Sequence, residues 1–181
     1  MSELKKDFSD NSSSRVAVIG GGAAGFFAAI STVEVARSAE VVLFESGNKV
    51  LRKVKVSGGG RCNVTHSCFD PAELAKKYPR GSRELRSAFH HWQPRDTIDW
   101  FGQAGVQTKT EEDGRMFPVS DCSQSVIDCL VGQARKLGVQ VLLERGMTGI
   151  EKGEAGQWVI ESGDGKKEAF DKVCIAAGSL K

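Results

Sequence analysis

The sequence has no long hydrophobic run, no closely spaced cysteine pair and almost no net charge. No stretch is apolar enough over sufficient length to cross a membrane, and residues 1–14 lack the apolar centre of a secretion signal. Lysine and arginine number 25 against 23 aspartates and glutamates, so the net charge of +2 gives no general reason to expect nucleic acid or an anionic membrane as a partner. These absences favour one globular domain that buries a core without disulfides or a metal.

Five cysteines are present, and no two of them form a Cys-x-x-Cys pair. An odd number leaves one over if the others pair, so a reduced intracellular protein is the simpler account. We therefore expect a cytoplasmic protein, or a plastid protein if the source is a plant. Residues 1–14 are expected to form a disordered leader, and their three acidic residues argue against a transit peptide.

A short apolar run, Val16 to Ile19, opens onto three spaced glycines. Gly20 allows a tight turn, Gly22 lets the backbone approach a pyrophosphate, and Gly25 lets a following helix pack closely on the strand. Glu45 ends the next apolar run twenty residues after Gly25, where a carboxylate accepts hydrogen bonds from a ribose. Strand, glycines, helix and acid together predict a dinucleotide-binding site, with phosphates at the helix N-terminus.

The hydrophobic periodicity predicts a doubly wound α/β domain whose crossover includes a β-meander. Residues 46–67 show no sustained period, and such a long irregular segment is usually functional. The elements expected along the chain are strands at 15–20, 41–45, 139–144 and 172–178, helices at 23–37, 71–78, 82–90, 95–104 and 123–137, an extended segment at 106–110, and meander strands at 147–152, 157–162 and 167–170.

A second glycine-rich cluster runs from Ser57 to Thr65 with the sequence SGGGRCNVT. Three consecutive glycines let backbone N–H groups approach a flat or anionic ligand. Arg61 offers a planar fork of donors, Asn63 a donor and an acceptor, and Thr65 a hydroxyl, which together suit the edge of a flavin ring. A flexible surface loop is an equally open interpretation of this cluster on its own.

The two glycine motifs, with Asp113 to Ser120 (DGRMFPVS), resemble a known family. It is the family of NAD(P)/FAD-dependent oxidoreductases that includes aminoacetone-oxidase-like and bile-acid dehydro-reductase-like flavoproteins. The resemblance runs from about Arg15 to the end and implies a Rossmann-like, three-layer FAD/NAD(P)-binding domain of the glutathione-reductase type at residues 15–181. It also implies that FAD, rather than a nicotinamide, occupies the site at Gly20–Gly25.

Site residues follow from this resemblance position by position. The first glycine motif would hold the pyrophosphate, Glu45 the ribose, the second motif the flavin, and the Met147 backbone the adenine. Ala177 replaces the threonine usual in the last turn, so a hydroxyl contact is lost there. His66 departs from the asparagine that commonly follows Thr65, so the resemblance assigns no contact at that rim of the loop. The expected cofactor-binding residues are Gly20, Gly22, Ala23, Ala24, Gly25, Glu45, Ser46, Lys53, Ser57, Gly58, Gly59, Gly60, Arg61, Cys62, Asn63, Thr65, Met147, Ala176, Ala177 and Gly178.

Members of that family are much longer. We therefore expect an N-terminal fragment that stops before a substrate domain and a closing FAD-binding segment, and that is inactive on its own. No Ser/His/Asp set or acid pair is arranged for hydrolysis, so the cofactor would carry the chemistry. The expected function is hydride transfer from a nicotinamide such as NAD(P)H, or from an organic donor, to a small-molecule acceptor. The alternative is a non-catalytic FAD- or NAD(P)-binding module with a redox-responsive interaction role.

Two local features leave alternatives open. Cys62 lies beside Arg61, where a cation would lower the thiol pKa, but packing is preferred to a redox role and no metal is expected at Cys62, His66 and Cys68. The basic stretch Lys76 to Arg86 reads first as the solvated face of two helices and second as a phosphate-steering patch near the cofactor. We expect no nucleic acid and no membrane as partner.

Overall fold

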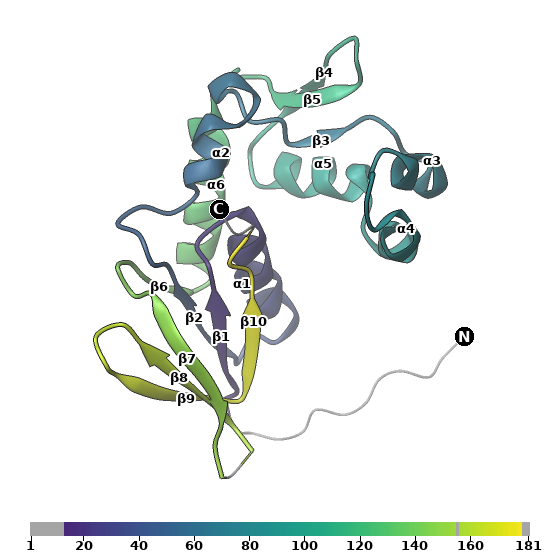
Figure 1. The fold of residues 1–181 in the computed structure, drawn as a ribbon. Coiled ribbons are helices and arrows are strands. Elements are labelled where there is room, and N and C mark those ends of the chain that lie inside the picture. Colours follow the sequence, from purple (N-terminus) through teal and green to yellow (C-terminus); the bar gives the residue numbers. More distant parts are fainter. Residues whose placement is uncertain (1–12, 155, 179–181) are drawn as a thin grey trace.

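Four parallel strands form the centre of the fold, and residues 13–154 and 156–178 are described by this computed structural model (Figure 1). The strand order is β10-β1-β2-β6. The register pairs Val18 with Leu43 on one side and with Cys174 on the other. Their bounds are Arg15–Ile19 for β1, Glu40–Phe44 for β2, Gln140–Leu142 for β6 and Lys172–Ile175 for β10.

A different layer covers each face of this sheet. Val16 and Val18 face a core shared with helices α1 (Ala23–Val35) and α6 (Ser123–Lys136). The alternating residues Ala17 and Ile19 face a second core shared with an antiparallel meander. Its strands are β7 (Met147–Lys152), β8 (Trp158–Ser162) and β9 (Lys167–Phe170). A strand buried on both faces explains the continuous apolar run, and the three-layer Rossmann-like fold is confirmed.

The chain between β2 and α6 forms a separate group of short elements beyond the end to which β1 and β10 point (Figure 1). Strand β5 pairs with both β3 and β4 in a small antiparallel sheet. The elements are α2 (Arg52–Val56), a 3₁₀ turn (Ser57–Gly60), β3 (Thr65–His66), α3 (Pro71–Lys76), α4 (Ser82–His91), α5 (Pro94–Gln103), β4 (Thr108–Thr110) and β5 (Arg115–Pro118).

Residues 46–67 are more regular than the sequence suggests, because they contain α2 and the 3₁₀ turn. Helix α2 has five residues, too few to show a hydrophobic period, and it is held by burial of Leu51 and Val54. The expected leader at residues 1–14 lies mostly outside the described residues. No helix in the described part of the chain is long and apolar enough to span a bilayer.

Phe170 joins the meander to the parallel sheet. Its side chain is 1% exposed, its ring centroid lies 5.8 Å from that of Phe44, and the Arg15 guanidinium lies 4.6 Å from the ring centre. We expect Phe170→Ala to lower the free energy of unfolding by about 3–5 kcal/mol in urea titrations, because a cavity opens between two layers. Val35→Ala, at a side chain 89% exposed, should change it by less than about 0.5 kcal/mol. Equal effects would contradict this packing.

Candidate dinucleotide-binding site

Two glycines of the motif between β1 and α1 lie against backbone carbonyl groups that leave no room for a Cβ. Gly20 has a φ of +116°, and its N–H donates to the Phe44 carbonyl at 2.8 Å. A Cβ on Gly20 would lie 2.4 Å from the Ala176 carbonyl oxygen. A Cβ on Gly25 would lie 1.8 Å from the Gly20 carbonyl oxygen. Both glycines are therefore required by the backbone itself, one for the turn and one for helix packing.

Gly22 is different, because nothing in the chain excludes a side chain there. Its φ of −85° suits any residue, and a Cβ would meet no atom within 4 Å. Gly22 is the N-cap of α1, and no side chain of the described residues caps this helix end. The open space therefore lies over the free N–H groups and the positive end of the helix dipole, which favours an anion.

Glu45, at the end of β2, is fixed beside this turn. One carboxylate oxygen accepts from the Gly21 N–H at 2.9 Å, and the other accepts from the Gly47 N–H at 2.7 Å and the Ser46 hydroxyl at 3.3 Å. Each carboxylate oxygen has more than one acceptor position, so both retain capacity for a ligand hydroxyl. The predicted ribose-binding acid is thus held at the predicted turn by backbone donors.

A cavity of about 610 Å³ brings these segments together. Among its lining residues are three cations from the segment that follows Glu45, namely Lys49, Arg52 and Lys53. The Lys53 ammonium lies 3.7 Å from where a Cβ of Gly178 would stand, so it reaches the turn after β10. Nine of the predicted site residues line this cavity: Gly20, Gly22, Ala23, Ala24, Glu45, Lys53, Ala176, Ala177 and Gly178.

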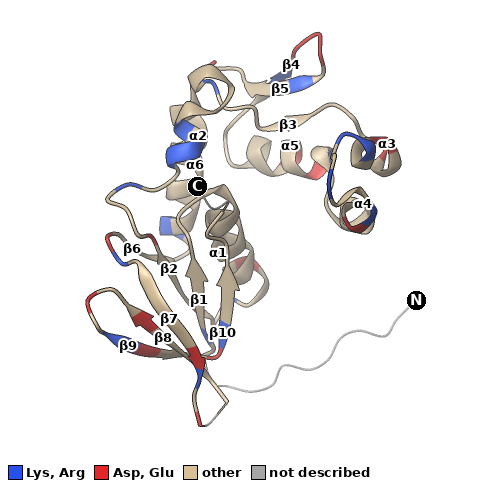
Figure 2. Cartoon of the chain, viewed as in Figure 1, with Lys and Arg blue, Asp and Glu red and all other residues tan. Residues whose placement is uncertain are grey.

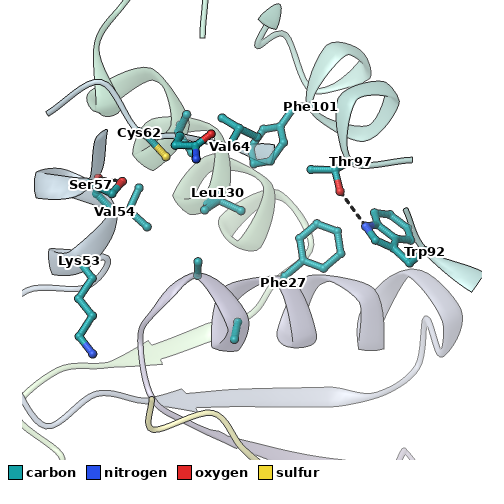
Figure 3. A pocket seen from close by; sticks show the side chains of 14 residues that line it. Phe27, Lys53, Val54, Ser57, Cys62, Val64, Trp92, Thr97, Phe101 and Leu130 are labelled. Carbon is teal, nitrogen blue, oxygen red and sulfur yellow. Dashed lines mark hydrogen bonds between the residues drawn. The ribbon is translucent and has the colours of Figure 1, made fainter. Parts of the chain in front are cut away.

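A second cavity of about 450 Å³ adjoins the first and is mainly apolar (Figure 3). The two cavities share Ala23, Ala24, Lys53 and Val54 in their walls. Phe27, Trp92 and Phe101 contribute aromatic rings to it, and the Trp92 indole N–H donates to the Thr97 hydroxyl at 2.9 Å. Three further predicted residues line this cavity: Ser57, Cys62 and Asn63.

The second glycine motif forms a turn with a left-handed backbone. Gly58, Gly59 and Gly60 all have φ between +55° and +86°, and Cys62 has a φ of +66°. The Cys62 N–H donates to the Ser57 carbonyl at 3.0 Å, which closes the turn. A Cβ on Gly58 would lie 2.7 Å from the Phe117 ring. Glycines are therefore needed for the left-handed backbone and for the close approach of this ring.

Arg61 is not brought to either cavity. Its guanidinium lies 4.0 Å from the centre of the Phe117 ring, forms an ion pair with Glu111, and lies 3.7 Å from an oxygen of Asp121. The hydrogen bond to Glu111 raises the pKa of Arg61 further above its usual value. The donors that sequence reasoning assigned to a flavin edge are thus engaged within the chain. The cavity walls also exclude Gly25, Ser46, Gly58, Gly59, Gly60, Thr65 and Met147.

Thr65 and Met147 have other structural places. Thr65 lies in β3 opposite Met116, and Met147 packs against the core between the sheet and the meander. The prediction that the Met147 backbone contacts adenine stays a prediction. Lys49 and Arg52 line the cavity beside Lys53, although neither is among the residues predicted from the sequence. The signal that could have identified them is the run of cations after Glu45.

The thiol pKa of Cys62 is shifted in the direction opposite to the one expected from its neighbour Arg61. The side chain is 6% exposed, and burial raises the pKa of the thiol despite an opposing hydrogen bond with Ser57. The Arg61 charge is directed to Glu111, so it does not activate the sulfur. The thiol therefore stays protonated at neutral pH, which argues against a reactive thiolate. Within the described ranges, no three His, Cys, Asp or Glu side chains form a group that could hold a metal ion.

The burial of Cys62 predicts that the cysteines react with an alkylating reagent at different rates. In the native protein at pH 7.5, we expect iodoacetamide to modify Cys62 at least about tenfold more slowly than exposed Cys122, with the reaction of Cys62 rising at higher pH than that of an ordinary thiol. Peptide mass spectrometry over time measures both rates. Unfolding in guanidinium should remove the difference. Faster modification of Cys62 in the native state would contradict its burial.

The family model for the HI0933-like protein Rossmann domain matches residues 14–181. The chain belongs to this family. Two curated relatives are the 3-dehydro-bile acid delta(4,6)-reductase of Clostridium scindens, 29% identical over 164 residues, and the ribosomal RNA dihydrouridine synthase of Escherichia coli, 30% identical over 163 residues. The alignments cover 91% and 90% of this chain and 39% of each relative. The chain thus spans about two fifths of their length.

Solved structures share the fold at low sequence identity. The 3-ketosteroid-delta4-(5alpha)-dehydrogenase of Rhodococcus jostii RHA1 matches with a TM-score of 0.64 and 16% identity, over 93% of this chain and 46% of that protein. THI4 of Thermovibrio ammonificans matches with a TM-score of 0.56 and 15% identity, over 92% of this chain and 58% of that protein. These similarities support the Rossmann-like fold.

Proposed function

We propose that this chain is the FAD-binding domain of an FAD-dependent oxidoreductase. The observation that carries the proposal is the open space at Gly22, which lies over the uncapped N-terminus of α1 and beside the fixed carboxylate of Glu45. A side chain at Gly22 meets nothing in the chain, so glycine there is explained by a ligand that approaches the backbone. The volume of about 610 Å³ is in the range of nucleotide and cofactor pockets.

The residues at this site fit an adenine dinucleotide. The free N–H groups at the start of α1, together with Arg52 and Lys53, would hold the pyrophosphate, and Glu45 would accept from the ribose hydroxyls. The turn Ala176 to Gly178 would border the chain that leads to the flavin, and Ser57 and Asn63 would border the ring side. Glu45 disfavours a ribose 2′-phosphate by like charge, so NADP is not expected in this position.

FAD supplies hydride transfer when bound, and the part of this chain is to bind and orient it. The apolar walls at Phe27, Phe101 and Leu130 would exclude water from the space beside the site. The names of the two curated relatives describe a reductase and a dihydrouridine synthase, which supports a redox role. We propose NADH or NADPH as the electron donor and the cytoplasm as the compartment.

The direct test is a fluorescence titration of the purified chain with FAD, run beside NAD and NADP. We expect FAD to bind, and Gly22→Val to weaken that binding at least about tenfold, equivalent to about 1.4 kcal/mol, because the side chain fills the space over the helix end. The thermal midpoint of Gly22→Val should fall only slightly, because valine is a poorer N-cap than glycine but meets no atom of the chain.

Gly132→Val is the matched control, since a Cβ at Gly132 on α6 also meets nothing within 4 Å. It should leave FAD binding unchanged. Its stability should rise slightly, because valine has a higher helix propensity than glycine. Binding of NAD in place of FAD, or equal FAD affinity of both variants and the parent chain, would overturn the assignment.

A non-catalytic FAD-binding module is the second candidate, because the site residues described above account for binding of the cofactor and not for electron transfer to it. The two candidates differ in whether bound FAD receives electrons. We expect anaerobic NADH or NADPH to bleach the flavin absorbance of the FAD-loaded protein. Dithionite serves as the positive control for reduction. Reduction by dithionite but by neither nicotinamide would favour the non-catalytic module.

A further inference from the structure

A concentration of positive charge lies on α3, α4 and the turn that joins them (Figure 2). Residues 76–86 contain five basic residues and one acidic residue, a net charge of +4, whereas the whole chain carries +2. The remaining residues are therefore net acidic. The five basic side chains, named here the α3–α4 basic surface, are Lys76, Lys77, Arg80, Arg83 and Arg86, and all are exposed.

The fold gathers these charges and leaves most of them uncompensated. Glu73 raises the pKa of Lys76 through a hydrogen bond, and the charge of Arg86 on α4 opposes that rise, so like charges from two helices lie near each other. Within residues 13–154 and 156–178, no carboxylate forms an ion pair with Lys77, Arg80, Arg83 or Arg86. Like charges held together repel each other, which is costly without a polyanionic partner.

The α3–α4 basic surface does not belong to the dinucleotide site, because none of its residues lines either cavity. This argues against steering of the cofactor phosphates. The surface is instead accompanied by exposed aromatic rings. Tyr78, between α3 and α4, is 43% exposed and packs against Phe89 at 5.4 Å. Trp92, at the end of α4, is 42% exposed and packs against Phe27 at 5.1 Å.

We propose that the α3–α4 basic surface binds single-stranded RNA, with phosphates on its lysines and arginines and bases stacked on Tyr78 and Trp92. Cations that follow a backbone and aromatic faces held by their own packing are the two components of single-strand recognition. An anionic membrane would engage the same cations and aromatic rings, and phosphatidylserine vesicles test that alternative below. Trp92 also forms a wall of the apolar cavity, so a base stacked there would lie at the rim of that cavity.

Fluorescence anisotropy with a short labelled oligouridylate tests the proposal on the chain without added FAD, so the result is independent of the flavin assignment. We expect the affinity to fall with salt, at a slope of about −0.7 per phosphate contacted. Arg80→Gln with Arg83→Gln should weaken binding at least about tenfold and reduce that slope by about 1.4. The matched control is Arg135→Gln with Lys136→Gln, which removes the same charge from exposed positions at the end of α6 and should change the affinity less than twofold.

The rings separate RNA from a general polyanion. Tyr78→Ala should weaken RNA binding about fivefold or more, within the range measured for base stacking, while leaving heparin binding unchanged. An unchanged thermal midpoint shows that this variant is folded. The proposal is overturned by equal losses in both arginine-containing double variants, by an unaffected Tyr78→Ala, by no RNA binding at low salt, or by tighter binding to phosphatidylserine vesicles than to RNA.

Discussion

The contact between Gly25 and the carbonyl of Gly20 determines the geometry of the whole site. Because a Cβ on Gly25 would stand 1.8 Å from that oxygen, α1 begins directly against the end of β1. The same turn passes so close to Ala176 that β10 and its following turn are fixed relative to the helix. The uncapped N-terminus of α1, Glu45 and the turn after β10 therefore face one space, although they are far apart in the sequence.

Glycine is thus required at Gly20, Gly22 and Gly25 for different physical reasons. Two are required by contacts within the chain, and substitution there acts on folding. Gly22 has an ordinary backbone conformation, and a Cβ there would meet no atom of the chain. Contacts within the chain therefore do not explain this glycine, whereas a bound ligand does. The motif itself predicts a separate role for each glycine. The structure adds the physical contacts: a carbonyl oxygen close to Gly20 and to Gly25, and open space at Gly22.

The sequence predicts the parallel sheet, the flanking helices and the meander because their hydrophobic periods are long and regular. It also places Glu45 beside the glycine turn. A helix that connects two neighbouring parallel strands crosses over with one handedness, so the ends of both strands lie side by side. The second glycine motif shows the limit of this reasoning. Arg61 has the donors for a ligand, but its orientation depends on Glu111 and Phe117, fifty or more residues away. No local pattern contains that pairing. The pKa of the Cys62 thiol is raised by burial, which likewise depends on packing between distant segments.

The binding of a dinucleotide at the start of α1 is the central claim, and amide chemical shifts test it at single residues. In ¹⁵N-labelled protein titrated with FAD, the account predicts the largest shifts at Gly21, Gly22, Ala23 and Glu45, with little change in β7–β9 beyond Met147. Shifts concentrated in the apolar cavity at Val126 and Leu130, with none at the glycine turn, would contradict it.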